Sequence, residues 1–211
     1  VFDEKFNQAI LFYAQVEENL KNDVLAHEAS MKLAKANFYK KDFDWTLQQV
    51  KNLKQSSSLL IANDAIEMFL LIQDNSAEDS LRVALQAYST ANLKLYQNKK
   101  EEALQLFLAI LQKHKGESIE EGTLFKVGKI YEEKGDFNKA LTYYQNILDN
   151  HKDGIYKDEA LYFSAEIYRK HLLDNEKAKA LYEKVVLEHP DSLYYTESRK
   201  QYRTLRGDTT I

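Results

Sequence analysis

The chain carries a pattern of residues that recurs every 37 or 38 positions, and this period restricts its fold more than any other feature. Ala140 and Tyr144 recur as Ala178 and Tyr182. Weaker copies of the same template lie upstream at Ala103, Phe107 and His114, at Thr46, Val50 and Leu53, and at Ala9, Tyr13 and Val16. Repeats of this length are typical of solenoids, in which similar units stack in a row. The sequence therefore predicts a linear array of similar units.

Each of the clearest units is expected to hold two helices. Leu124, Gly128 and Tyr131 lie four and three residues apart, which places them on one face of a first helix. Gly135 follows, in a turn where it can take the left-handed conformation that ends many helices. The stripe of Ala140 and Tyr144 then marks a second helix. With one proline and six glycines in 211 residues, the whole chain is expected to be helical.

These stripes resemble the tetratricopeptide repeat. That family alternates a small residue and an aromatic on the first helix with Ala, an aromatic and Pro on the second. The matching residues are Gly128, Tyr131, Ala140 and Tyr144 in one unit and Ala165, Tyr168, Ala178, Tyr182 and Pro190 in the next. The resemblance implies an all-α, tetratricopeptide-like α-solenoid, a right-handed superhelix of antiparallel helix pairs, with about 11 helices.

One interval departs from the period. Thr46 and Ala103 are 57 positions apart, and the surplus equals about one additional helix. The apolar stretch at 57–73 is expected to form that helix and to be buried, because it is apolar on most sides. We therefore expect residues 1–74 to be irregular and residues 75–211 to form a regular array that ends in a polar capping helix at 192–206. Both parts are expected to belong to one continuous solenoid.

Several classes of chemistry find no support in the sequence. Cysteine is absent, and there is no Gly-rich phosphate loop, nucleophile elbow or His-Glu-x-x-His motif, so no enzyme and no cofactor is expected. His114, His151 and His189 occupy equivalent positions at the ends of successive second helices, so we expect them to interact with helix dipoles and not to share a metal ion.

The partner is expected to be a protein or peptide. The net charge of −4 disfavours a nucleic-acid partner. A helical-repeat nucleic-acid-binding module nevertheless remains the alternative, as does the non-catalytic part of a larger enzyme.

Ligands of the family that the chain resembles lie along the concave side formed by the first helices. Three columns of residues correspond to this side: Met31, Tyr88, Phe125 and Tyr162; Lys35, Asn92, Lys129 and Glu166; Phe38, Leu95, Glu132 and Arg169. The candidate partner-binding residues are Tyr88, Asn92, Phe125, Lys129, Tyr162, Glu166 and Arg169. The alternative is that the rings of the first column pack against neighbouring helices. The lysine that clamps a peptide carboxylate in chaperone-binding members is absent, since Phe125 and Tyr162 take its place.

Trp45 is the only tryptophan and occupies a position that is exposed in a regular array. It either contacts a partner or a segment preceding the chain, or fills a gap in an irregular unit.

The location is expected from resemblance. The pattern is similar to the C-terminal region of Bacteroidetes-type envelope repeat proteins and to periplasmic repeat proteins of the Tol–Pal coordinator and barrel-assembly lipoprotein kind. This favours the periplasm or cell envelope, with the cytoplasm as the alternative. No apolar run reaches the roughly 18 residues that a membrane span needs. The chain starts at Val1 and shows no signal-peptide pattern. It is therefore expected to be a piece of a longer or processed protein.

Overall fold

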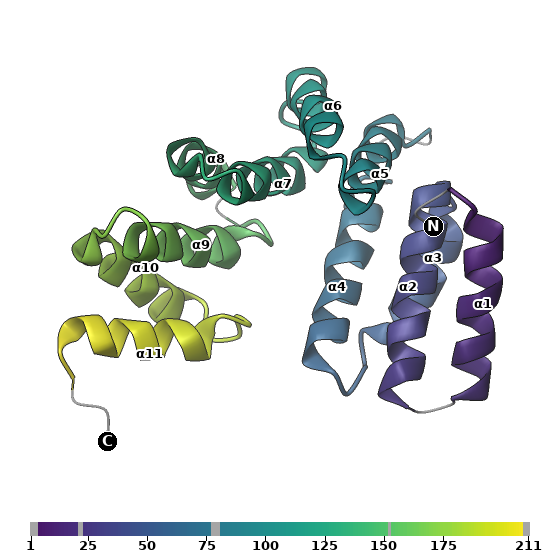
Figure 1. Ribbon diagram of the computed structural model, residues 1–211, viewed down its shortest axis with the longest axis horizontal. Helices are drawn as coiled ribbons and strands as arrows, with labels where there is room; N and C mark the ends of the chain where they lie inside the picture. The colour runs from purple at the N-terminus through teal and green to yellow at the C-terminus, as the bar shows by residue number, and fades with distance from the viewer. Residues whose placement is uncertain (1–3, 21–22, 77–80, 152, 209–211) are drawn as a thin grey trace. The chain divides into compact units, whose positions relative to one another are not determined.

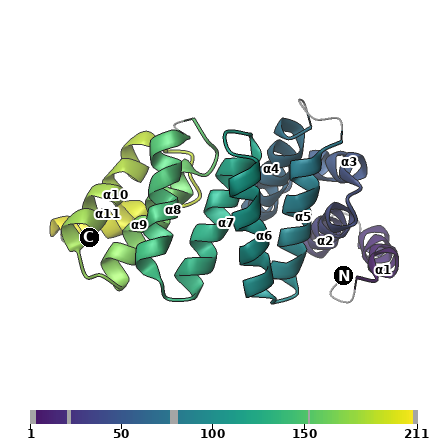
Figure 2. The same ribbon diagram turned by 90° about the horizontal axis from the view of Figure 1, so that it is seen from above.

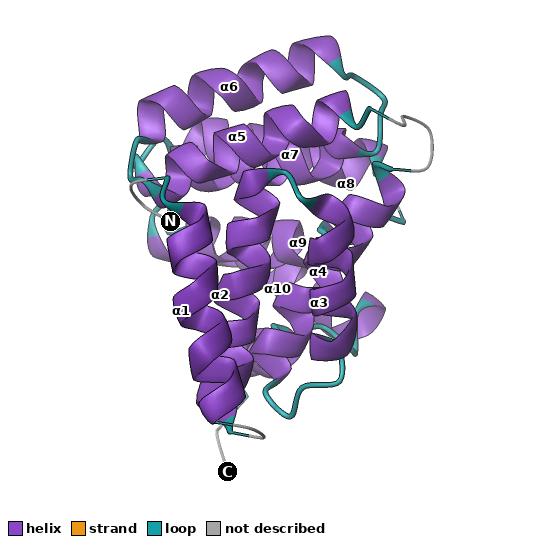
Figure 3. Cartoon of the chain, turned by 90° about the vertical axis from the view of Figure 1, so that its right-hand side faces the viewer, coloured by secondary structure: helices purple, strands orange, loops and turns teal. Residues whose placement is uncertain are grey.

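A computed structural model describes residues 4–20, 23–76, 81–151 and 153–208 of the chain (Figure 1). Eleven α-helices and no strands are formed by these residues, so the predicted all-α fold is confirmed. The helices are α1 (Phe6–Asn19), α2 (Val24–Lys40), α3 (Phe43–Leu53), α4 (Leu59–Asp74), α5 (Val83–Tyr96), α6 (Lys100–Lys113), α7 (Ile119–Glu133), α8 (Phe137–Asn150), α9 (Lys157–Lys170), α10 (Asn175–Glu188) and α11 (Tyr195–Arg206). The connections that the structure describes between them are loops and turns (Figure 3). Within the described part of the chain, no helix is both long and apolar enough to cross a membrane.

The chain divides into two compact units, residues 1–120 and residues 121–211. In the first unit α2 packs against α1 and α3, and α5 packs against α6. In the second unit α9 packs against α8 and α10, and α10 packs against α11 (Figure 2). Packing of these helices on their neighbours in sequence is the arrangement that the repeat predicts. The expected change in regularity between residues 74 and 75 stays a prediction.

The second helices bury the template residues. The three positions marked by Ala140, Tyr144 and Ile147 are at most 5% exposed wherever the template recurs from α3 onward. Their equivalents are Thr46, Val50 and Leu53 on α3, Ala103, Phe107 and Ile110 on α6, and Ala178, Tyr182 and Val185 on α10. A small residue at the first position lets two helices approach closely, and the larger residues fill the space beside it.

The turn inside each helix pair has a repeated backbone conformation. A residue with positive φ lies two positions before the start of each of four second helices: Lys41, Asn98, Gly135 and Leu173. An aspartate follows in three of these turns, and its side chain accepts a hydrogen bond from the backbone N–H three residues later. Such caps satisfy donors that the first helical turn leaves without a partner. Gly135, with φ of 77°, takes the left-handed conformation expected from the sequence.

The additional helix is α4, which lies close to the expected residues. Its burial differs from the expectation, because only one face is covered. Ile61, Ala65 and Ile72 are buried, whereas Leu59 and Leu60 at its start are 74% and 66% exposed. The buried face packs against α2 and α3, and the Nζ of Lys35 lies 2.8 Å from a carboxylate oxygen of Asp64. An apolar composition therefore did not imply burial all round.

Candidate functional site

The first of the three predicted columns is mostly buried. Met31, Tyr88 and Phe125 are all less than a tenth exposed, and Tyr162 is half-buried. In the first unit, the ring of Tyr88 meets the ring of Phe107 edge-on at 5.5 Å between centroids. These contacts favour the interpretation in which the rings pack against neighbouring helices.

In the second unit, the first-column rings stack on rings that come later in the chain. Phe125 stacks on Tyr156 with centroids 4.9 Å apart and an interplanar angle of 22°. Tyr162 stacks on Tyr194 at 4.3 Å and 19°. Tyr156 and Tyr194 immediately precede α9 and α11 and are themselves 38 positions apart. The period could therefore have identified them, although the sequence analysis did not.

Phe163 is a further aromatic residue that the sequence analysis missed. Its ring centroid lies 6.0 Å from that of Phe125, 5.3 Å from that of Tyr162 and 5.4 Å from that of Tyr194. The ammonium of Lys129 lies 3.6 Å from the centroid of the same ring, within the range of a cation–π interaction. Phe163 thus contacts rings from successive repeats and also Lys129 of the first helix α7.

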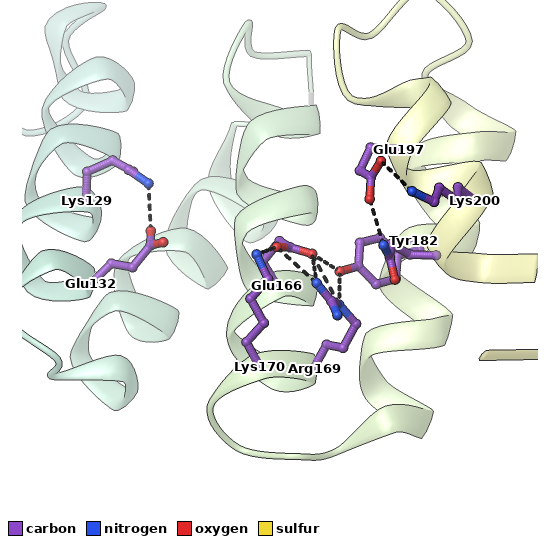
Figure 4. A network of polar contacts seen from close by, with 9 residues as sticks. Lys129, Glu132, Glu166, Arg169, Lys170, Tyr182, Glu197 and Lys200 are labelled. Atoms are coloured by element: carbon purple, nitrogen blue, oxygen red, sulfur yellow. Dashed lines mark hydrogen bonds and ion pairs between the residues drawn. The ribbon is translucent and has the colours of Figure 1, made fainter. Parts of the chain in front are cut away.

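The second and third columns form polar contacts along α7 (Figure 4). The Nζ of Lys129 donates a hydrogen bond to Glu132 Oε2 at 2.9 Å. The hydroxyl of Tyr144, on α8, donates to the same oxygen at 2.7 Å. A buried second-helix tyrosine therefore supports a charged pair on the first helix.

The next repeat contains a related network with its charges in the opposite order. Glu166 takes the position of Lys129, and Arg169 takes the position of Glu132. Tyr182 donates a hydrogen bond to Glu166, and Nη2 of Arg169 donates to the same carboxylate at 3.1 Å. Lys170 also pairs with Glu166 (Figure 4). The polar columns thus present Lys–Glu on α7 and Glu–Arg on α9.

The charge state of this second network follows from its contacts. Burial favours a raised pKa for the Glu166 carboxyl, but hydrogen bonds from Lys170, Tyr182 and Arg169 outweigh burial and hold the pKa below its ordinary value. Burial and the neighbouring Glu166 carboxylate raise the pKa of the Tyr182 hydroxyl. Glu166 is therefore charged and Tyr182 keeps its proton near neutral pH.

Replacing Glu166 with glutamine should destabilise residues 121–211 by about 1–2 kcal/mol at pH 7, because hydrogen bonds to a charged group are lost. A carboxyl whose pKa is depressed by folding contributes stability above its unfolded pKa, and loses it as the pH falls through the folded value. The difference between Glu166→Gln and the unchanged chain should therefore shrink below about pH 4.5.

Urea unfolding followed by circular dichroism at several pH values measures this difference. Glu176→Gln is the matched control, since Glu176 forms its ion pair with Lys179 on the exposed surface of α10 and should contribute little. A difference for Glu166→Gln that stays constant from pH 7 to pH 3 would contradict the assigned network.

The candidate residues of the first unit make different contacts. The side-chain amide of Asn92 donates to the backbone oxygen of Tyr88 at 3.2 Å, within its own helix. Of the third column, Phe38 is 2% exposed. Partly exposed charges at the column positions of two successive first helices are therefore found on α7 and α9. We call the side of these helices that carries Lys129, Glu132, Glu166 and Arg169 the inner face.

Glu121 holds the loop that leads into α9 and was also missed from the sequence. Its Oε1 accepts a hydrogen bond from the backbone N–H of Tyr156 at 2.8 Å. A Cβ at Gly154 would lie 2.1 Å from the same oxygen, so a side chain there would displace the carboxylate. Burial raises the pKa of Glu121 although these backbone contacts oppose it. The loop that positions Tyr156 against Phe125 therefore depends on a glycine and a half-buried carboxyl group.

The histidines occupy the predicted kind of position. His114, His151 and His189 are the C-cap residues of α6, α8 and α10, and the backbone N–H of each bonds to the carbonyl four residues earlier. Among the described residues, no three metal-ligating side chains come together. Trp45 is 52% exposed at the start of α3, so it does not fill a gap in the interior.

Comparison with known families agrees with this geometry. A family model described as the tetratricopeptide repeat matches residues 123–154 and 159–192. The first segment covers most of α7 and all of α8, and the second covers most of α9 and all of α10. No curated protein matches the chain.

Proposed function

We propose that this chain, which carries tetratricopeptide repeats at residues 123–154 and 159–192, is a scaffold that binds a protein or peptide through the inner face of α7 and α9. Repeats of this type serve in general as modules of protein–protein interaction. Solenoids offer extended surfaces on which successive units present equivalent side chains to one partner. The partner of this chain would therefore contact equivalent positions of the two repeats.

The observation that carries the proposal is the order of charges at those positions. Lys129 and Glu132 on α7 are followed by Glu166 and Arg169 on α9, with the signs exchanged. The side chains of Lys129, Glu132 and Arg169 are between a fifth and a third exposed, so they combine fixed positions with access to solvent. Fixed charges of this kind select partners and set their register more than they add raw affinity.

The surface fits a segment that carries both charges and an apolar side. Tyr162 and Phe163 are half-buried next to the charged positions and offer part of their rings to such a side. The carboxylate-clamp type of peptide binding is not part of this proposal, because the clamp lysine is absent. The wider setting in a larger bacterial envelope protein rests on resemblance alone, and we propose it on that basis.

Charge reversal on this face tests the proposal. Peptides selected from a random displayed library on the unchanged chain provide the probe, and their affinities are measured by titration calorimetry. Lys129→Glu should lower the affinity for the selected peptides by about tenfold or more, because it places a charge of the wrong sign opposite the bound segment. A tenfold loss corresponds to about 1.4 kcal/mol of binding free energy.

Lys184→Glu is the matched control, since it makes the same change of charge on the exposed surface of α10. Circular dichroism should show that both variants keep their helical content. If selected peptides bind both variants as tightly as the unchanged chain, the inner face of α7 and α9 is not the binding surface.

A further inference from the structure

Helix α1 belongs to the class of second helices. The pattern Phe6, Ala9 and Val16 recurs 37 positions later as Phe43, Thr46 and Leu53 at the start, middle and end of α3. Tyr13 likewise occupies the position that Tyr144 takes on α8, as the repeat offsets show. In each later pair, the helix of this class follows a first helix and packs against it. The register therefore identifies α1 as the second member of a pair.

The backbone just before α1 supports the same assignment independently. Glu4 has φ of 60° and lies two positions before the start of α1. Lys41, Asn98, Gly135 and Leu173 have positive φ at the same distance before α3, α6, α8 and α10. In those four turns, the left-handed residue reverses the chain between a first helix and its second helix. Glu4 thus has the backbone conformation that this position has in the four later turns.

The face of α1 that a first helix would cover is apolar and exposed. Phe12 is 55% exposed and Val16 is 39% exposed. The equivalents of Val16 on the later second helices are Leu53, Ile110, Ile147 and Val185, which are at most 5% exposed. Helix α1 packs against α2, which lies beside it in Figure 1. Large apolar side chains in an exposed stripe on a repeat helix indicate an interface.

The later pairs show what covers the position of Phe12. Its equivalent on α8 is Tyr143, whose ring stacks on Tyr131 of α7 with centroids 5.6 Å apart. Its equivalent on α3 is Gln49, whose side-chain oxygen accepts a hydrogen bond from Asn37 of α2 at 3.0 Å. In both pairs, the first helix of the same unit makes the contact.

The last helix gives the contrasting case. Counting 38 positions on from α9, the stripe of Leu161, Ala165 and Tyr168 becomes Arg199, Arg203 and Arg206 on α11, all exposed. These positions on α9 belong to the stripe that marks a first helix. Arginines there suit water and oppose the docking of an apolar helix. The exposed stripe on α11 is therefore charged, whereas the exposed stripe on α1 contains the apolar Phe12 and Val16.

We propose that the face of α1 bearing Phe12 and Val16 is the docking site of a first helix contributed by the same polypeptide, through the turn at Glu4. The repeat also defines the chemistry of that helix. A Cβ on Gly128 would lie 2.5 Å from the ring of Tyr144, whose equivalent on α1 is Tyr13. The covering helix therefore carries a glycine or alanine above Tyr13 and, three residues later, an aromatic that meets Phe12.

A graft of the chain's own first helix tests this inference without relying on the proposed binding function. Residues 1–5 are replaced by a copy of residues 119–136, so that the copy of Asp136 precedes Phe6 as Asp136 precedes Phe137. Hydrogen–deuterium exchange then compares the amides of α1 with those of α3 in the same molecule. In the grafted chain, exchange of α1 should slow by about tenfold or more, while that of α3 changes little.

Two variants make the result specific. In a control graft, Gly128→Leu in the copy should prevent close approach to Tyr13, and exchange of α1 should remain fast. Phe12→Ser should remove most of the protection that the intact graft gives. Helical content by circular dichroism establishes that the rest of each chain is folded.

Other occupants give different results. In the ungrafted chain, the amides of α1 could already be protected as well as those of α3. If that protection rises with protein concentration and sedimentation shows a dimer, this face binds a second copy and the proposal is overturned. An intact graft that leaves α1 exchanging as fast as the control graft would also overturn it.

Discussion

Gly128→Leu should lower the free energy of unfolding of residues 121–211 by about 3 kcal/mol, at the upper end of overpacking costs. A Cβ at this position would already lie 2.5 Å from Cε1 and 2.9 Å from Cδ1 of Tyr144, closer than van der Waals contact allows. Tyr144 is fully buried and its hydroxyl is fixed by Glu132, so the ring has little freedom to move away. The added side chain therefore has to separate α7 from α8 or displace the tyrosine together with its hydrogen bond.

Urea unfolding followed by circular dichroism measures this loss, with Gly128→Ala as an intermediate step that introduces the Cβ alone. Gly135→Asn is the control, because nothing lies within 4 Å of a Cβ there and asparagine tolerates the left-handed conformation. An unchanged midpoint for Gly128→Leu would reject the register assigned to α7 and α8.

Phe125→Ala should also destabilise residues 121–211, by about 3–4 kcal/mol, the range for truncation of a buried phenylalanine. Its ring is 8% exposed and lies against Tyr156, Tyr144 and Phe163. Adding Tyr162→Ala should increase the loss by a smaller amount, since Tyr162 is only half-buried. Leu187→Ala is the control, because Leu187 is 73% exposed on α10 and should be nearly neutral.

The same variants separate packing from binding. Melting temperature, helical content and affinity for a selected peptide are measured on each protein. If Phe125→Ala melts early and loses affinity only as it unfolds, the first column is part of the interior. A variant that melts like the unchanged chain but no longer binds would instead make Phe125 a contact residue and would contradict the packing derived from its stacked ring.

The candidate site was predictable in part. The sequence identified the positions of Lys129, Glu166 and Arg169, because first-helix positions follow directly from the repeat. Whether these residues bind a partner stays a prediction. Burial of Tyr88 and Phe125 was one of two interpretations that the sequence left open, and the contacts of both rings favour it. The choice required knowledge of what lies opposite each ring, which periodicity within one helix does not contain.

The sequence by itself determined the local features of this protein. The left-handed turn at Gly135 and the histidines at the ends of the second helices are both present. Each depends on backbone groups within about four residues, so the residue types alone specify it. The all-helical repeat was predictable for the same reason, because each unit contains the same local pattern of residues.

Only the tertiary structure decided which surfaces these helices cover. Phe125 stacks on Tyr156, and Glu121 accepts a hydrogen bond from the loop that follows Gly154. Leu59 on α4 and Phe12 on α1 are exposed. All four features depend on segments that are far from the residue in sequence. A stripe of apolar residues shows that a helix has a face suited to burial. Whether that face is buried depends on whether another segment lies against it, and this is a property of the assembled fold.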